Sequence, residues 1–124
     1  MRQVPETVPP IENWSRLLDG RVALVTGGGD GIGGAISRLF AEHGANVEIE
    51  EIDPVRAETI GAEIEQAGGT ARSHVLDVRQ VVDVARLRSL VVDEHGGADI
   101  VVNNVGDYRP LVRLEDSGPE SWRE

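Results

Sequence analysis

A glycine-rich segment, TGGGDGIG at positions 26–33, is the first feature of the sequence that points to a chemical role. Gly27 would let the chain turn sharply off a strand, Gly31 would let the backbone approach a pyrophosphate, and Gly33 would let a helix pack on the strand. The phosphates would then face free amide groups at a helix N-terminus, where the helix dipole favours negative charge. A purely structural turn is the alternative, but the place of the segment between an expected strand and helix favours nucleotide binding.

Carboxylates form the second chemical feature, because Glu50, Glu51 and Asp53 stand at the end of the next expected strand. A carboxylate at this place can accept hydrogen bonds from both ribose hydroxyls of an adenosine, and it would repel a 2′-phosphate. The spacing favours Glu51 for this role, with Asp53 as second choice and a solvated strand end as the non-functional alternative. Asp30, inside the glycine turn, adds negative charge near the same ribose. Both features predict NAD rather than NADP as the cofactor.

Chemistry at these positions requires a scaffold, and the apolar pattern predicts one. Short apolar runs at about 22–25, 47–51, 71–76 and 100–102 indicate strands, and segments with helical spacing lie between them. Strands that alternate with helices of this length predict right-handed βαβ units and a parallel sheet, so the expected fold class is α/β. The residues expected on the buried helix faces are Ile32, Ala35, Ile36, Leu39 and Phe40 in the first helix, Ala57, Ile60, Ile64 and Ala67 in the second, and Val84, Leu87 and Val91 in the third.

Two sets of residues fit this scaffold less easily. Glu48 and Glu50 fall in the second strand, although a strand that is covered on both faces normally carries apolar residues. A partly open sheet face is the explanation that this pattern suggests. His43, His74 and His95 are scattered without the spacing of metal ligands, and we expect them at the surface or at helix ends.

The chain divides into an extension and one domain. Residues 1–19 contain three of the six prolines, and we expect an irregular segment with Trp14 as a packing anchor. Residues 20–124 are expected to form a partial dinucleotide-binding domain. A helix-start signature begins at Ser117, and the sequence stops about two turns later without a stop signal. This pattern predicts a truncated domain that ends inside a helix.

Composition narrows the classes of function. The chain has 124 residues, a net charge of −10 and no cysteine, so disulfides and thiolate metal sites are excluded and nucleic acid is not an expected partner. No apolar run approaches the length of a membrane span and no signal peptide is recognisable, so we expect a soluble, cytoplasmic protein without a membrane partner. All 12 basic residues are arginine, which leaves the chain without a lysine for catalysis.

Three motifs in register resemble the short-chain dehydrogenase/reductase family. They are Thr26-Gly27-x-x-x-Gly31-x-Gly33, the Asp77-Val78 pair after the third expected strand, and Asn103-Asn104-Val105-Gly106 after the fourth. Their order and spacing fit the family from about residue 18 to residue 124, and they argue against a methyltransferase-type Rossmann domain. The resemblance implies a Rossmann-type parallel sheet with strand order 3-2-1-4.

The resemblance also implies roles for individual residues. Asp77 would hydrogen-bond the adenine amino group, and Val78 would contact the ring through its backbone. Asn104 and Gly106 would border the adenosine ribose, while Asn103 would hold neighbouring strands together. The alternative is that Asp77 is only a turn residue and that the asparagines only end a strand. The turn from Gly27 to Gly33, with Asp30, Gly31 and Ile32 inside it, would wrap the pyrophosphate.

Two departures from the family pattern stand out. Val105 occupies a position where the family usually has alanine, and its two extra methyl groups would shift or weaken the contact with the cofactor. The family's active-site tyrosine, with a lysine four residues later, has no counterpart in the sequence. Tyr108 is followed four residues later by Val112, and we interpret it as a loop residue near the substrate side or as a packing residue. No catalytic residue can be assigned.

We therefore expect the cofactor-binding half of an NAD-dependent oxidoreductase that acts on an alcohol/carbonyl pair, with the catalytic half missing. The parent enzyme would take a small-molecule alcohol or ketone and would form a homo-oligomer, as the family implies. The chain alone is expected to be inactive, because it holds no Tyr-x-x-x-Lys motif. A catalytically silent NAD-binding or partner-binding module is one alternative, and a non-functional gene remnant is another.

Overall fold

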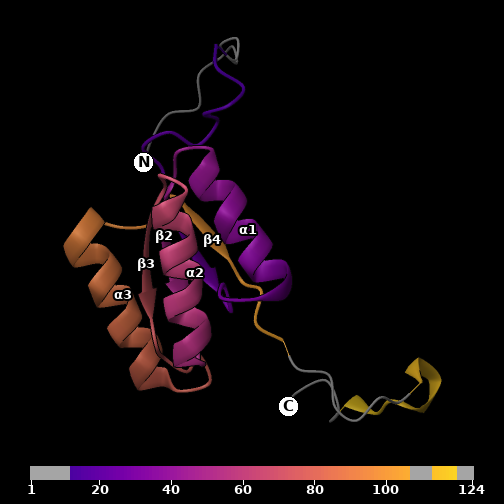
Figure 1. The fold of residues 1–124 in the computed structure, drawn as a ribbon. Coiled ribbons are helices and arrows are strands. Elements are labelled where there is room, and N and C mark those ends of the chain that lie inside the picture. The colour runs from indigo at the N-terminus through magenta and orange to yellow at the C-terminus, as the bar shows by residue number, and fades with distance from the viewer. Residues whose placement is uncertain (1–11, 107–112, 120–124) are drawn as a thin grey trace, which may run out of the picture.

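A parallel sheet forms the centre of the molecule (Figure 1). A computed structural model describes residues 12–106 and 113–119 of the chain. Strand β1 lies between β2 and β4, with Val25 opposite both Ile49 and Val102 in parallel register. The order β3-β2-β1-β4 confirms the predicted α/β sheet and its topology. The strand bounds are β1 Val22–Thr26, β2 Asn46–Glu50, β3 Thr70–His74 and β4 Ile100–Val102.

Helices cover both faces of this sheet. Ala23 and Val25 of β1 belong to a core that includes residues of the first two helices, whereas Val22 and Leu24 pack in a second core with the third helix. Since successive side chains of a strand point to opposite faces, α1 and α2 lie on one face and α3 lies on the other (Figure 1). Their bounds are α1 Gly31–Glu42, α2 Pro54–Gln66 and α3 Val81–His95, and a 3₁₀ helix, η1, covers Leu114–Asp116.

The buried face of α1 differs from the predicted apolar stripe. Ile32 is 76% exposed, and Ala35 and Leu39 are also exposed, so these three assignments are wrong, and Ile36 and Phe40 are only partly buried. Small residues carry the buried face instead, because α1 approaches the glycine turn and the sheet more closely than long side chains would allow. The buried positions of α1 are Gly33, Gly34, Ser37 and Ala41.

Helices α2 and α3 follow the predicted pattern more closely. Ala57, Ile60 and Ile64 of α2 are buried as predicted, although Ala67 is exposed just beyond the end of the helix. In α3, Leu87 and Val91 are buried. Val84 is exposed, since it lies beside an open cleft next to β4 and not beneath another element.

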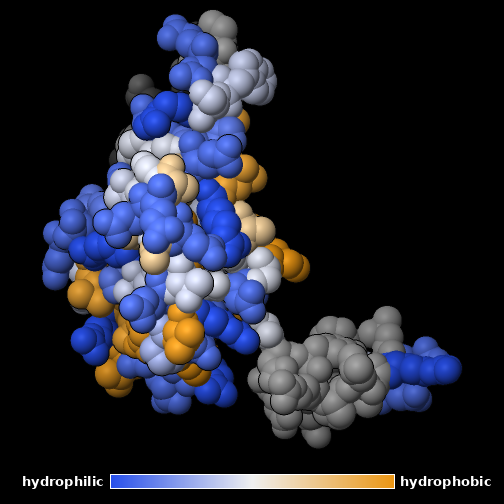
Figure 2. Space-filling view, in the orientation of Figure 1, coloured by the Kyte–Doolittle hydropathy of each residue, from blue (hydrophilic) through white to orange (hydrophobic). Residues whose placement is uncertain are grey.

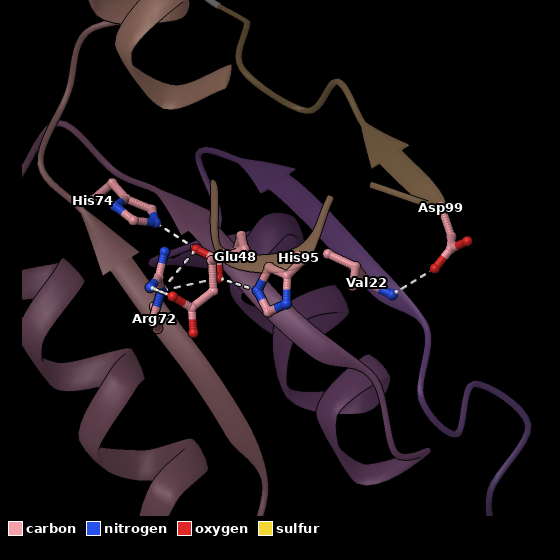
Figure 3. A network of polar contacts seen from close by, with 7 residues as sticks. Val22, Glu48, Arg72, His74, His95 and Asp99 are labelled. Atoms are coloured by element: carbon pink, nitrogen blue, oxygen red, sulfur yellow. Dashed lines mark hydrogen bonds and ion pairs between the residues drawn. The ribbon is translucent and has the colours of Figure 1, made fainter. Parts of the chain in front are cut away.

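A buried ion-pair network contradicts the predicted open face at β2 (Figure 3). Glu48 is only 1% exposed, because the end of α3 covers it. Its carboxylate oxygens lie 2.5 Å from Nε2 of His74 and 2.7 Å from Nε2 of His95. Arg72 Nε lies 3.0 Å from Oε1 of Glu48, and Arg72 also pairs with Glu94. His95 ends its helix as predicted, whereas His74 lies within β3 and is largely buried.

The partners of Glu48 explain why a charged residue is tolerated in this strand. Burial raises the pKa of Glu48, but hydrogen bonds from His74 and His95 and the positive charge of Arg72 lower it, and the net shift is downward. The carboxylate therefore stays ionised inside the fold, where an unpaired charge would be very unfavourable. The network joins β2, β3 and the C-terminal end of α3.

The segment before β1 is anchored by a residue other than the predicted one. Trp14 is mostly exposed, so its predicted role as a packing anchor is wrong. Leu18 packs against the main core, and its backbone N–H donates to the carbonyl oxygen of His43. Gly20 N–H donates to the carbonyl oxygen of Gly44, just beyond the end of α1. These bonds fix the entry into β1.

Two predictions fall outside the described residues. Tyr108 lies in one of the gaps, and most of the helix predicted from Ser117 lies beyond residue 119. Ser117 itself is not helical. Within the described ranges, no helix combines the length and the apolar character that crossing a membrane requires.

Candidate functional site

The carboxyl ends of the strands meet at one edge of the sheet, where a cavity of about 260 Å³ opens. The chain winds from β1 toward β2 and β3 on one side and returns to β4 on the other, so the winding direction reverses next to β1. Ligands of open α/β sheets bind in the crevice at such a point. Five of the predicted site residues line the cavity: Gly27, Glu51, Asp77, Val78 and Gly106.

The remaining predicted residues lie around the cavity without lining it. Asp30, Gly31, Ile32 and Gly33 belong to the glycine turn and the first turn of α1, and Asn104 follows β4. The glycine turn leaves β1 through Gly27, whose φ of 60° lies in the left-handed region that glycine adopts without strain. The predicted residues therefore occupy a single edge of the sheet.

Sequence reasoning missed two lining residues, Ile52 and Arg79, and it named Glu50 at the strand end without choosing it as a site residue. Glu50 had a signal, because a glutamate is unusual in a strand that is covered on both faces. Ile52 directly follows the predicted ribose-binding carboxylate, and it is exposed at the cavity. Arg79 stands two residues after Asp77, a spacing that allows an ion pair within one loop.

The start of α1 differs from the start of α2 in how its amides are satisfied. Asp53 caps α2, and its Oδ1 accepts hydrogen bonds from the backbone N–H groups of Val55 and Arg56. Asp30 occupies the equivalent position of α1 but makes no side-chain capping bond, and its carboxylate instead lies 3.6 Å from Nε of Arg56. The first turn of α1 therefore offers amides that no side chain caps, a common setting for a bound phosphate.

Glu51 lies directly against the glycine turn. A Cβ atom on Gly29 would come within 2.6 Å of Cγ and Oε1 of Glu51, so a larger residue there would displace this carboxylate. The side chain also accepts a 3.3 Å hydrogen bond from the backbone N–H of Asp53. Of the two carboxylates considered for the ribose, Glu51 borders the cavity while the Asp53 side chain is engaged as a helix cap.

Asp77 and Arg79 form a paired charge at the other side of the cavity. Arg79 Nε and Nη2 lie 2.9 and 2.8 Å from the two carboxylate oxygens of Asp77. This side-chain hydrogen bond, a further one from the Arg79 backbone N–H, and the Arg79 charge hold the pKa of Asp77 below its ordinary value. The backbone N–H of Asp77 donates to the Asp83 carboxylate in the first turn of α3. The Asp77 carboxylate is therefore ionised and fixed in place.

Asn104 joins the loop after β4 to the end of β1. Its Nδ2 donates to the carbonyl oxygens of Thr26 and Gly27 at 3.1 and 3.2 Å. Its backbone N–H donates to Oγ1 of Thr26, 3.0 Å away. The strand-joining role expected of Asn103 is thus carried by Asn104, whereas Asn103 is exposed beside the neighbouring apolar cleft.

Exposed hydrophobic residues gather near the same edge. Figure 2 shows hydrophobic residues at the lower end of the molecule, over the N-termini of α2 and α3. A mainly apolar cavity with a few charged groups is typical of small-molecule sites. Exposed hydrophobic residues in and just before the first turns of α2 and α3 are Ile52, Val55, Val81 and Val82, and Ile32 is exposed in the first turn of α1.

Comparison with known proteins gives a consistent result. A family model described as short chain dehydrogenase matches residues 21–124. An uncharacterized oxidoreductase of Thermotoga maritima is 44% identical over 123 residues, which cover 83% of this chain and 45% of the relative. A D-beta-hydroxybutyrate dehydrogenase of Cupriavidus necator is 36% identical over 108 residues, which cover 86% of this chain and 41% of the relative. The chain thus spans less than half the length of these relatives.

Solved structures show the same likeness. A 7 alpha-hydroxysteroid dehydrogenase complexed with NADH superposes with a TM-score of 0.76 at 33% identity, covering 91% of this chain and 44% of the other. A metagenomic short-chain oxidoreductase in complex with NADP has a TM-score of 0.73 at 36% identity, and the match covers 85% of this chain and 48% of the other. Both nicotinamide cofactors therefore occur among proteins similar to this chain.

Proposed function

This chain belongs to the short-chain dehydrogenase family, and we propose that it binds the adenosine and pyrophosphate end of NAD for an oxidoreductase acting on an alcohol/carbonyl pair. The observation that carries this proposal is the position of Glu51. Its side chain is 5% exposed, lies against Gly29 of the glycine turn and lines the cavity at the switch point of the sheet. A carboxylate there would receive both ribose hydroxyls.

The glycine turn would hold the pyrophosphate. The uncapped amides at the start of α1 and the helix dipole both favour a bound anion at that point. Gly27, Gly31, Ile32 and Gly33 would contribute backbone to this part of the site. In this arrangement Asp77 and Val78 would contact the adenine, and Gly106 and Asn104 would border the adenosine ribose.

The charges around the cavity support NAD over NADP. Glu51 and Asp77 line it, and a 2′-phosphate beside them would be repelled. Two arginines near this edge have acidic partners in the described part of the chain, since Arg79 pairs with Asp77 and Arg56 with Asp30. A 2′-phosphate would have to compete with those carboxylates for either arginine.

No residue of these 124 is assigned to the hydride transfer itself. NAD would supply the hydride acceptor, while the residues of this chain bind and orient its adenosine half. The parent enzyme would use a small alcohol or ketone, act in the cytoplasm and assemble as a homo-oligomer.

Calorimetric titration with NAD⁺ and NADP⁺ tests the proposal. We expect NAD⁺ to bind more tightly by about tenfold or more, because a phosphate against a carboxylate is unfavourable by more than about 1.4 kcal/mol. Glu51→Ala should weaken NAD⁺ binding and narrow the preference, whereas Glu58→Gln, at an exposed position of α2, should change neither. Equal or tighter binding of NADP⁺ by the unaltered chain would refute the NAD assignment.

A further inference from the structure

Glu50, the last residue of β2, binds the glycine turn through both its side chain and its backbone. Its side chain is 2% exposed and lines the cavity. Oε2 of Glu50 accepts a 3.1 Å hydrogen bond from the backbone N–H of Gly27, and the Glu50 carbonyl oxygen accepts a 3.0 Å bond from Gly28. One residue thus holds the first two amides of the turn, one through its side chain and one through its backbone.

The surroundings of this carboxylate are acidic. Burial raises the pKa of Glu50, the Gly27 N–H lowers it, and the negative charges of Glu51, Asp77 and Asp83 raise it further, so the net shift is upward. Arg79 is the cation among the described lining residues, and Asp77 binds it through two hydrogen bonds. The site is therefore rich in negative charge before an anionic ligand arrives.

Charged groups on the neighbouring strands do not neutralise Glu50. His74 is the register partner of Glu50 on β3, but its Nε2 is bound to Glu48. Glu48, two residues earlier on β2, is itself matched by Arg72 and His95.

We propose that binding of a dinucleotide is coupled to the uptake of one proton by Glu50, which then holds the Gly27 N–H as a neutral carboxyl group. The inference rests on the proposed function, because the pyrophosphate would bring negative charge to the turn that Glu50 supports. The proton comes from solvent and converts the carboxylate to a carboxylic acid. Its carbonyl oxygen still accepts the bond from Gly27, so the turn keeps its shape while the repulsion is removed.

The coupling has a thermodynamic consequence. If the ligand favours the protonated form of Glu50, protonation favours the ligand by the same factor. NAD⁺ affinity should therefore rise as the pH falls toward the raised pKa of Glu50, by up to about tenfold per pH unit for one proton.

Calorimetry in two buffers with different ionisation enthalpies, phosphate and Tris, measures the proton uptake directly. We expect uptake when NAD⁺ binds the unaltered 124-residue chain and almost none with Glu50→Gln, which mimics the neutral form. Glu50→Gln should also bind NAD⁺ about three- to tenfold more tightly near neutral pH. Glu65→Gln, at an exposed position of α2, is the matched control and should behave like the unaltered chain.

The outcomes separate the two proposals. Binding without proton uptake, or equal uptake by Glu50→Gln, would overturn this inference alone. No binding of NAD⁺ at any pH between about 5 and 8 would overturn the proposed function and this inference with it. A second readout does not depend on a variant: the ¹³C resonance of the Glu50 carboxyl should move to its protonated position when NAD⁺ is added. A resonance that stays at its ionised position would contradict the inference.

Discussion

A Cβ atom on Gly33 would lie 2.1 Å from the carbonyl oxygen of Gly27. The contact joins the first turn of α1 to the residue at which the chain leaves β1, so the helix and the turn are packed backbone against backbone. Nδ2 of Asn104, which also donates to that carbonyl oxygen, would lie 2.6 Å from the same Cβ. This packing fixes the position of α1 over the cavity edge.

Gly33→Ala should therefore displace α1 from the glycine turn. We expect NAD⁺ binding to be lost or weakened at least tenfold and the unfolding free energy to fall by about 1–3 kcal/mol, the usual effect of overpacking. Gly34→Ala is the matched control, because its nearest contacts are the flexible end of Arg38 at 3.2 Å and the Gly29 backbone at 3.4 Å. Calorimetric titration and thermal melts of both variants test this. Equal NAD⁺ binding by Gly33→Ala and Gly34→Ala would show that the close contact between Gly33 and Gly27 is not needed for cofactor binding.

The two carboxylates near the start of α2 should separate by their effects. Asp53→Ala removes two capping hydrogen bonds, so we expect a loss of about 1 kcal/mol in unfolding free energy with little change in cofactor preference. Glu51→Ala should narrow the preference for NAD⁺ over NADP⁺ and should change the unfolding free energy little. Chemical denaturation followed by circular dichroism, alongside titration with NAD⁺ and NADP⁺, measures both effects. A relaxed cofactor preference in Asp53→Ala would assign the ribose role to Asp53 instead.

Most element bounds could be predicted from the sequence because strands and helices repeat with distinct apolar periods, whereas the order of the strands was implied by the family resemblance. The apolar pattern misassigned the face of α1 because periodicity assumes that the largest apolar residues are buried. At this helix, close approach of the backbones decides burial, so Gly33 and Ser37 are inside while Ile32 and Leu39 are exposed. That approach depends on a turn folded beneath the helix, which a one-dimensional pattern does not contain.

The environment of Glu48 was unpredictable for a different reason. Its partners His74 and His95 lie 26 and 47 residues away in the chain, and only the order of the strands and the length of α3 bring them together. The motif residues were easier to predict because each follows directly from the end of a strand. Arg79 could not be predicted in this way, because its ion pair with Asp77 depends on the conformation of one short loop.

Glu48 should make the stability of the fold sensitive to acid. Its pKa is lowered in the folded state, so its contribution is present above the unfolded pKa and is lost as the pH falls through the lower, folded value. Glu48→Gln should lower the unfolding free energy by about 1–3 kcal/mol at neutral pH and flatten its decline below about pH 4.5. Urea denaturation between neutral and acidic pH measures this.

Glu94→Gln is the control for that experiment. Glu94 also pairs with Arg72, but its side chain is half exposed, and we expect a change of less than about 1 kcal/mol. The same stability and pH slope in Glu48→Gln as in the unaltered chain would mean that the network adds nothing to folding.

We expect no hydride transfer by the 124 residues alone. The sequence holds no lysine, and the residue four positions after its one tyrosine, Tyr108, is Val112, so the Tyr-x-x-x-Lys pair that would exchange a proton with the substrate is missing. Absorbance of NADH at 340 nm with a panel of alcohols, compared with a protein-free sample, measures the activity. Reproducible NADH formation by purified protein would refute this expectation.

The edge of the sheet at β4 should promote association of the chain. Within the described residues β4 is an outer strand, and Val101 at its centre is 54% exposed. A cleft of about 370 Å³ lies beside it, lined by apolar side chains that include Val84 and Leu87. An outer strand with unpaired N–H and C=O groups can pair with another chain, and each apolar side chain that becomes buried contributes about 1.5–3 kcal/mol.

Association should rise with protein concentration and with salt, because the net charge of −10 keeps molecules apart only while it is unscreened. Val101→Lys should reduce it by placing a charge on the edge. Val82→Lys should not, because Val82 is a more exposed valine on α3 and does not belong to the strand edge. Sedimentation velocity at low and high ionic strength compares the three chains. A monodisperse, cooperatively melting monomer under both conditions would show that the exposed β4 edge does not cause association. It would favour the alternative that the chain is a self-sufficient binding module.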